Sequence, residues 1–295
     1  MKVDIVQGSQ EWSNARLERV TGSQLSSILG INPYVSEHEL WLEKKGLGKP
    51  WVDNPAAAHG RKMEPELRRQ YEERMGEAYA PTVELIDEWG LSSTDGVNKD
   101  RTRVLEIKTC GKDVFAKAQN GVIPDYYVSQ GAFSLAAIPT AKEVEFMFSW
   151  KAEVCYVTLH RDDLYIEKVS AIAKDWYDRY LVGDEEPPLS ERDYIPMDGD
   201  LQWACTAAEA RIVYAEYKEL ERQWKAIKER LLDCTDGGSA KGCGITIINT
   251  TRKGSIDTDK LAQDHGIDLE KYRKPSTIST RITVNLKFTS DNNES

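Results

Sequence analysis

The chain has 295 residues, of which 40% are hydrophobic and 30% are charged, and its formal net charge is −10. This length and apolar content allow one large domain or a domain with an appendage. No apolar run is long enough to span a membrane, and the N-terminus lacks the apolar segment of a signal peptide, so we expect a cytosolic protein. The five cysteines form no CxxC pair, which argues against a zinc site and a disulfide framework.

The acidic net charge counts against a nucleic-acid-binding protein, because a protein that binds phosphates needs a basic surface. This objection is weak, because acidic metal ligands and an acidic outer surface lower the net charge without removing a local basic groove. The composition therefore leaves DNA open as a ligand.

The N-terminal region is expected to contain two short helices. Residues 14–30 indicate a strand or loop followed by a helix, which Thr21 or Ser23 can cap and Gly30 can end. Residues 32–46 indicate a turn and then the second helix.

A third helix is indicated by an apolar face with a spacing of four residues, formed by Met63, Leu67, Tyr71 and Met75. Proline is tolerated in the first turn of a helix but not in its interior. The position of Pro65 therefore predicts that this helix starts near Glu64.

From residue 81 the sequence pattern becomes typical of β-strands. Residues 81–97 and 103–109 are expected to form strands around a polar turn at 98–102. A helix over 124–138, a strand hairpin over 143–160 and a helix over 165–181 follow. This order predicts an α/β fold with a mixed central sheet flanked by helices.

The pattern divides the chain into a main domain at 1–185, a linker with a long helix at 186–236, and a small strand-helix-strand module at 237–295. The long helix has an apolar stripe spaced alternately by four and three residues, formed by Val213, Tyr217, Leu220, Trp224, Ile227 and Leu231. Either packing on its own domain or pairing with another chain explains this coiled-coil-like stripe.

The segment with the clearest chemical pattern is Asp95 followed by Glu106, Ile107 and Lys108. Neighbouring antiparallel strands place Asp95 beside Glu106, so two carboxylates can share a hard cation, with the carbonyl of Ile107 as a third ligand. Glu106 and Lys108 point to one face of their strand, which we expect to be exposed. Lys108 can then reach the attacking water or the phosphate. The pattern predicts metal-assisted phosphodiester hydrolysis with one or two Mg²⁺ ions, for which Mn²⁺ is a possible substitute.

Four further motifs occur in one order along the chain: HGRKMEPELRRQY, STDGV, LEIKT and YYVSQGAF. Together with the upstream WSNARLERVTGSQLSSILG, they closely resemble the YqaJ-like viral recombinase group, relatives of the phage lambda-type 5′-3′ exonuclease. The similarity covers roughly residues 8–180. It implies a restriction-endonuclease-like core of the PD-(D/E)XK superfamily.

The resemblance implies a role for several residues. Asp95 and Glu106 would be metal ligands, Lys108 would be catalytic, Glu64 would be a supporting acidic residue, and Gln130 would position active-site groups. A second set would contact DNA and its terminal 5′-phosphate, consisting of Arg16, Ser23 and Tyr127. His59 is a candidate metal ligand, but the YqaJ-like group does not usually require a histidine at this position.

The implied activity is digestion of one strand of linear duplex DNA from its 5′ end, which leaves 3′ overhangs for a phage-type single-strand annealing protein. The resemblance also implies a phage or prophage protein in a bacterial host cell that assembles as a ring-like trimer around DNA. Two alternatives stay open: a restriction-like endonuclease with the same core, and a non-catalytic scaffold that binds DNA ends.

Overall fold

The computed structural model describes residues 1–48, 55–251 and 254–272. It divides into two compact units, Met1–Ile195 and Pro196–Ser295. The predicted domain boundaries at 185 and 236 stay a prediction. Within the first unit, residues after 185 contact the N-terminal region, because Glu186 pairs with His38 at 2.7 Å and Arg192 donates to the carbonyl of Asn32 at 2.8 Å.

The first unit contains a seven-stranded sheet with the strand order β1-β3-β4-β5-β6-β7, to which β2 adds by pairing with β4. The β5–β6 and β2–β4 pairs are parallel and the others are antiparallel. The sheet is therefore mixed, as predicted. Its strands are β1 (Lys2–Val3), β2 (Val20–Thr21), β3 (Tyr79–Ile86), β4 (Gly90–Asn98), β5 (Arg103–Thr109), β6 (Glu143–Trp150) and β7 (Glu153–His160).

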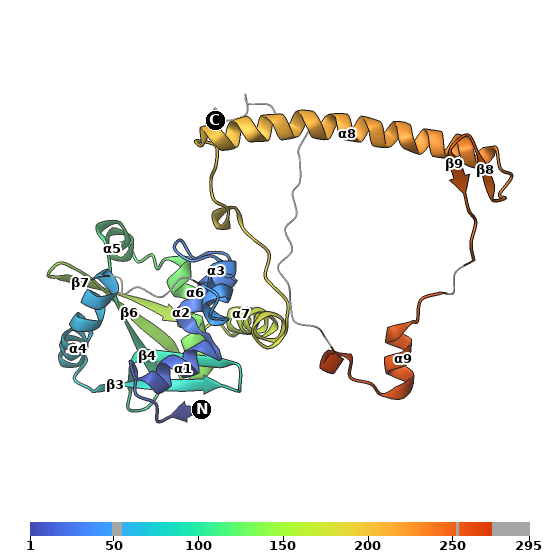
Figure 1. Cartoon of the computed structure of the whole chain (residues 1–295). Coiled ribbons are helices and arrows are strands. Elements are labelled where there is room, and N and C mark those ends of the chain that lie inside the picture. The colour runs from blue at the N-terminus through green and yellow to red at the C-terminus, as the bar shows by residue number, and fades with distance from the viewer. Residues whose placement is uncertain (49–54, 252–253, 273–295) are drawn as a thin grey trace. The chain divides into compact units, whose positions relative to one another are not determined.

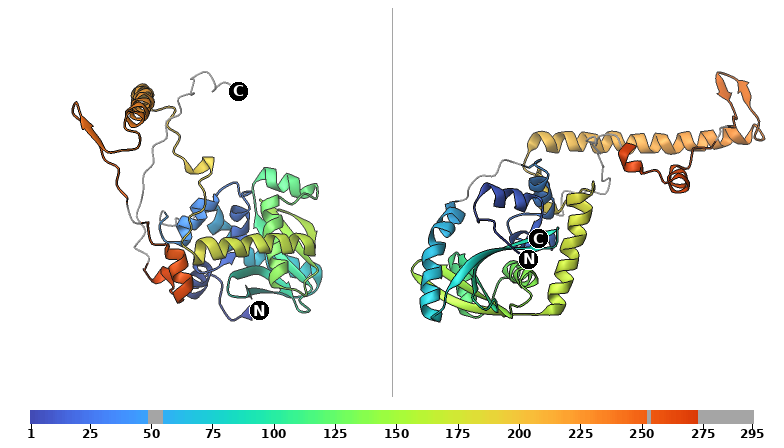
Figure 2. Two further views of the ribbon diagram at one scale, coloured as in Figure 1. Left: turned by 90° about the vertical axis from the view of Figure 1, so that its right-hand side faces the viewer. Right: turned by 90° about the horizontal axis from the view of Figure 1, so that it is seen from below.

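Helices cover both faces of this sheet (Figures 1 and 2). Leu67 and Tyr71 of α4 pack on Leu105 and Ile107 of β5, whereas α2, α6 and α7 pack on the opposite face, which Val104 belongs to. The helices of this unit are α1 (Gln10–Leu17), α2 (Gly22–Ile28), α3 (Glu37–Lys44), α4 (Pro55–Met75), α5 (Lys112–Gln119), α6 (Asp125–Ala137) and α7 (Asp163–Trp176), which continues as a π-helical segment Tyr177–Val182.

Three sequence predictions are wrong in detail. Helix α4 begins at Pro55 instead of near Glu64, so Pro55 is the proline of the first turn and Pro65 lies in the interior. The expected strand or loop from residue 14 begins too early, because residues 14–17 are the end of α1, which Ser9 caps by accepting from the amide of Trp12. A strand does precede α2, but only at Val20–Thr21.

The third error concerns the face of β5 that carries Glu106 and Lys108. We expected this face to be exposed, but Glu106 has only 1% of its surface exposed and the side chain of Lys108 has 13%. The reason is that α6 covers this face while α4 covers the other. A sheet with helices on both faces buries both sides of its central strands.

The second unit contains α8 (Leu201–Asp233), the antiparallel pair β8 (Ala240–Gly242) and β9 (Ile245–Ile247), and α9 (Thr258–His265). The predicted strand-helix-strand module has its second strand, at 278–288, outside the described residues. In the part of the chain that the structure describes, no helix has both the length and the apolarity needed to cross a bilayer.

Candidate active site

The candidate site lies where β4 and β5 separate. The two strands pair at Val97–Val104 and Gly96–Leu105, after which β5 continues beside β6 alone as far as Thr109. Beyond the last pair, Oδ2 of Asp95 accepts a hydrogen bond of 2.6 Å from the backbone amide of Ile107. The carboxylate of Asp95 therefore occupies the position where a backbone carbonyl would continue the ladder, and it lies next to Glu106 as the spacing predicted.

Three side chains surround the carboxylate of Glu106. Oε2 accepts hydrogen bonds from Nζ of Lys108 and from Nε2 of Gln130, both at 2.8 Å, and Oε1 accepts from Oγ of Ser134 at 3.3 Å. Gln130 and Ser134 are four residues apart on α6 and so lie on one face of that helix. The helix therefore fixes both oxygens of Glu106 within a buried site.

Helix α4 adds a third carboxylate next to this pair. Oε1 of Glu64 accepts from Nη1 of Arg68 at 3.2 Å, and the same guanidinium nitrogen donates to the backbone carbonyl of Asp95 at 2.7 Å. Arg68 thus ties α4 to β4 at the point where the strands separate. Burial raises the pKa of Glu64, and repulsion by the nearby carboxylate of Asp95 raises it further.

Burial disfavours the charged form of both central carboxylates. It raises the pKa of Asp95, and it raises the pKa of Glu106 to about 7 despite the opposing effect of Lys108. Burial alone would lower the pKa of Lys108, but the charges of Glu106 and Asp95 outweigh it and raise that pKa. Burial therefore outweighs the positive charge of Lys108 at both carboxylates.

Close packing of α4 against β5 brings these groups together. A Cβ atom at Gly60 would come within 2.9 Å of Oγ1 of Thr109, so a larger residue would push α4 away from the end of β5. His59 precedes this glycine and lines a hollow of about 430 Å³ that Tyr127 also lines. Tyr127 lies beside the site itself, because Nζ of Lys108 is 5.3 Å from the centroid of its ring.

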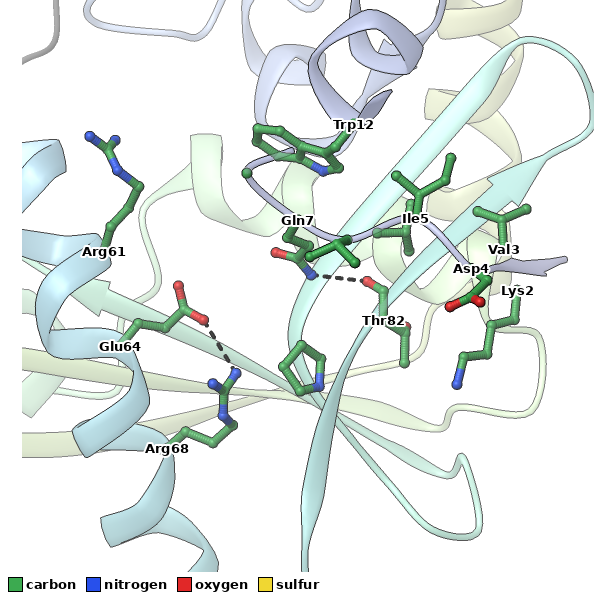
Figure 3. A pocket seen from close by; sticks show the side chains of 14 residues that line it. Lys2, Val3, Asp4, Ile5, Gln7, Trp12, Arg61, Glu64, Arg68 and Thr82 are labelled. Atoms are coloured by element: carbon green, nitrogen blue, oxygen red, sulfur yellow. Dashed lines mark hydrogen bonds and ion pairs between the residues drawn. The ribbon is translucent and has the colours of Figure 1, made fainter. Parts of the chain in front are cut away.

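A larger hollow of about 690 Å³ adjoins the site on the side of the N-terminal segment (Figure 3). Arg61, Glu64 and Arg68 line it from α4, and Trp12 lines it from α1. Glu64 therefore belongs both to the cluster of carboxylates and to the wall of this hollow. The hollow provides space beside the carboxylates for an extended ligand.

Arg16 and Ser23 lie together, as the N-terminal motif suggested. Nη2 of Arg16 is 3.5 Å from Oγ of Ser23, and its guanidinium lies 4.5 Å from the centroid of the Trp12 ring. This pair is connected to the carboxylates, because Gly22 packs against Gln130, with 3.5 Å between the position of a Cβ atom at Gly22 and the side chain of Gln130. The backbone that precedes Ser23 therefore contacts the residue that holds Glu106.

The donor set fits a divalent cation that keeps water in its coordination shell. Asp95 and Glu106 supply oxygen ligands, and their raised pKa values are what burial without a full countercharge produces. Within the described ranges, no group of three His, Cys, Asp or Glu side chains is placed so that it could hold a metal ion by itself. A metal ion at this place would take further ligands from the carbonyl of Ile107, from water or from a substrate phosphate, as Mg²⁺ commonly does.

Sequence reasoning missed Arg68, Ser134 and Lys44. Arg68 follows Glu64 by four residues and Ser134 follows Gln130 by four, so helical spacing from each predicted residue could have found them. No local signal identifies Lys44, whose Nζ donates to the carbonyls of Arg16 and Arg19. These contacts hold the C-terminal end of α1, and hence Arg16, against α3.

Comparison with known proteins shows which family the chain resembles. The sequence model of the YqaJ-like viral recombinase domain matches residues 11–141. The chain is 23% identical over 298 residues to the uncharacterized protein YqaJ of Bacillus subtilis (strain 168), and the match covers 90% of each chain. The predicted resemblance to the YqaJ-like group is thereby confirmed.

One of two similar solved structures supports the fold. Two crystal structures of LHK-Exo, an alkaline exonuclease from Laribacter hongkongensis, match with TM-scores of 0.49 and, for the complex with dAMP, 0.50. Their sequences are 21% and 20% identical, and each match covers 59% of this chain and 93% of the other. The second match and the mixed sheet flanked by helices confirm the predicted α/β fold with a mixed central sheet.

Proposed function

We propose that this YqaJ-like chain is a metal-dependent exonuclease that hydrolyses phosphodiester bonds of linear double-stranded DNA from the 5′ end and leaves 3′ overhangs. The observation that supports it best is the arrangement of Asp95, Glu106 and Lys108 at the separation of β4 and β5. Two adjacent carboxylates with one amine are suited to bind a divalent cation and a phosphate at the same place.

Each side chain has a distinct task in this proposal. Asp95, Glu106 and the carbonyl of Ile107 hold Mg²⁺, or Mn²⁺ in its place, as one or two ions. The bound metal supplies neutralisation of phosphate charge and a lower pKa for a coordinated water. Lys108 directs its positive charge at the attacking water or the phosphate, and Gln130 keeps Glu106 oriented.

The assignment of the 5′ end depends on Arg16 and Ser23. A guanidinium can donate two charge-assisted hydrogen bonds to a terminal phosphate, and the hydroxyl of Ser23 lies 3.5 Å away as a further donor. Arg16 is partly buried, and this burial lowers the pKa of its guanidinium. A partly desolvated cation binds a phosphate more strongly than one fully surrounded by water.

The hollow between α4 and α1 is the proposed path of a DNA strand beside the carboxylates, with Tyr127 as a further DNA contact on the opposite side of α4. In this proposal, three copies of the chain form a ring around the duplex. The overhang then passes to a single-strand annealing protein. The net charge of −10 agrees with such a ring because only the inner surface needs to be basic.

The test compares linear duplex DNA with covalently closed circles, each incubated with Mg²⁺ or with EDTA. The proposal expects that only the linear DNA is digested, and only in Mg²⁺. When one strand carries a label at its 5′ end, that label should be released first. Cleavage of the circles would instead support a restriction-like endonuclease. Binding of DNA ends without cleavage in either Mg²⁺ or EDTA would support a non-catalytic scaffold.

A further inference from the structure

Helix α8 is 33 residues long and none of its described residues is buried. Large apolar side chains on it are exposed, among them Val213 at 58%, Leu220 at 63% and Trp224 at 54%. Helices of proteins owe most of their stability to packing of an apolar face, and a contiguous exposed apolar face marks an interaction surface. This face of α8 therefore requires a partner.

The spacing of these side chains is that of a coiled coil. In heptad notation, the a positions are Ala210, Tyr217, Trp224 and Leu231, and the d positions are Val213, Leu220, Ile227 and Cys234. Such a repeat keeps one seam of a helix facing another helix over its whole length, whereas packing on a globular domain requires a wider apolar face.

The charges beside this seam differ between the two halves of the helix. At the flanking e and g positions, the N-terminal half carries Glu209 and Glu216, Glu221 lies near the middle of the seam, and the C-terminal end carries Lys228 and Arg230. All five side chains are exposed. Charges at these positions determine which orientation two helices adopt.

We propose that α8 pairs with α8 of a second copy of this chain in an antiparallel coiled coil. In this orientation Glu209 and Glu216 of each helix lie towards the basic C-terminal end of the other, where one of them pairs with Arg230, depending on the register. A parallel pair would instead place Glu216 of one copy beside Glu221 of the other, and like charges would repel. The inference rests on α8 alone and is independent of the proposed nuclease activity.

The natural cysteine at the end of the seam distinguishes the two orientations. In a parallel pair, Cys234 faces Cys234 of the second copy, whereas in an antiparallel pair it faces the start of the helix. The a positions there are Trp203 and Ala210, which correspond to two neighbouring registers. Positions 210 and 234 are about 36 Å apart along one helix, so a disulfide between them joins two chains.

The experiment uses the full-length chain with the exposed Cys205 and Cys243 changed to serine. Mild oxidation of this background should give no dimer through Cys234. Addition of either Ala210→Cys or Trp203→Cys should give a disulfide-linked dimer, identified by peptide mapping of the 234 linkage. A dimer through Cys234 alone would overturn the antiparallel orientation. Absence of any cross-link at all three positions would overturn the pairing and indicate another part of the chain or another protein as the partner.

Charge reversal gives a second test that leaves the apolar seam intact. Arg230→Glu should weaken self-association in sedimentation equilibrium by roughly fivefold, because each copy loses an attractive pair. The triple variant Glu209→Arg, Glu216→Arg and Arg230→Glu should restore it. Glu229→Arg changes a charge at the f position, away from the seam, and serves as the matched control. An equal effect of the control and Arg230→Glu would contradict the proposed seam.

Discussion

Gln130 of α6 donates a hydrogen bond of 2.8 Å to the same oxygen of Glu106 that Lys108 contacts. The amide of Gln130 has no charge, so it orients the carboxylate of Glu106 without adding a positive charge that would repel a bound cation. Ser134 contacts the other oxygen at the longer distance of 3.3 Å. This arrangement makes Gln130 a positioning residue whose effect should appear in metal binding.

Gln130→Ala should therefore weaken the metal affinity by about tenfold to hundredfold, as expected when an outer partner of a metal ligand is removed. The readout is the Mg²⁺ concentration that gives half-maximal activity, compared with the rate at saturating Mg²⁺. Gln119→Ala, at an exposed position on α5, is the control. A lower rate at every Mg²⁺ concentration, without a shift of the midpoint, would contradict the positioning role.

Asp95→Asn and Glu106→Gln should each reduce cleavage by roughly a thousandfold or more, because loss of a ligand removes several kcal/mol of charge stabilisation by the metal. Both substitutions preserve shape, so circular dichroism and thermal unfolding should show a folded protein. Glu145→Gln on the neighbouring strand β6 is the control and should retain activity. Near-normal cleavage by Asp95→Asn would remove Asp95 from the proposed site.

Lys108→Met should separate binding from chemistry. The substitution keeps the aliphatic part of the side chain and removes the charge, so DNA should still bind in Ca²⁺ while cleavage in Mg²⁺ falls by about a hundredfold or more. Lys112→Met, at an exposed position of α5, controls for loss of a positive charge. If DNA affinity and rate fell by the same factor, Lys108 would be a phosphate contact without a catalytic role.

The sequence predicts the centre of the site because local rules determine it. Alternation along β5 places Glu106 and Lys108 on one face, and a spacing of three on α6 places Tyr127 and Gln130 beside them. The burial of Glu106 and the contact of Arg68 with the carbonyl of Asp95 depend on the packing of two helices on the sheet. Such contacts join residues far apart in sequence and leave no periodic signal.

The start of α4 was missed for a related reason. Pro65 locally favours a first turn, but α4 continues through it while Leu67 and Tyr71 pack on β5, so tertiary contacts outweigh the cost of one missing hydrogen bond. The capping of α2 by Thr21 and the hairpin of β6 and β7 depend on short-range signals, and both agree with the prediction.

The buried Lys44 should make the free energy of unfolding depend on pH. Burial lowers its pKa to about 7, so between about pH 7 and its ordinary value the unfolded chain binds more protons than the folded one. The contribution of this group to the free energy of unfolding should therefore rise with pH, by about 1.5 kcal/mol from pH 7 to 8.5. Denaturant titrations of the wild type and Lys44→Met at both pH values measure this difference.

The exposed Lys62→Met is the control for that experiment and should follow the wild type at both pH values. Lys44→Met lacks the titrating group, so its stability should rise less than that of the wild type over the same range. Parallel changes in the wild type and Lys44→Met would show that the two carbonyl acceptors keep Lys44 charged throughout.

The terminal phosphate distinguishes an exonuclease from an enzyme that cuts internally. If Arg16 and Ser23 capture the 5′ end, linear duplex with a 5′-phosphate should be digested at least about tenfold faster than the same duplex with a 5′-hydroxyl, because hydrogen bonds to a charged group are lost. Arg16→Ala should abolish most of this preference and leave the Mg²⁺ dependence unchanged, since Arg16 contacts the DNA end and not the metal. Arg69→Ala, which removes an exposed arginine from α4, should keep the preference. The preference should also decrease as salt rises, because part of it is attraction between charges. Equal rates of the wild type on both substrates would contradict the phosphate pocket and would favour an endonuclease that does not depend on DNA ends.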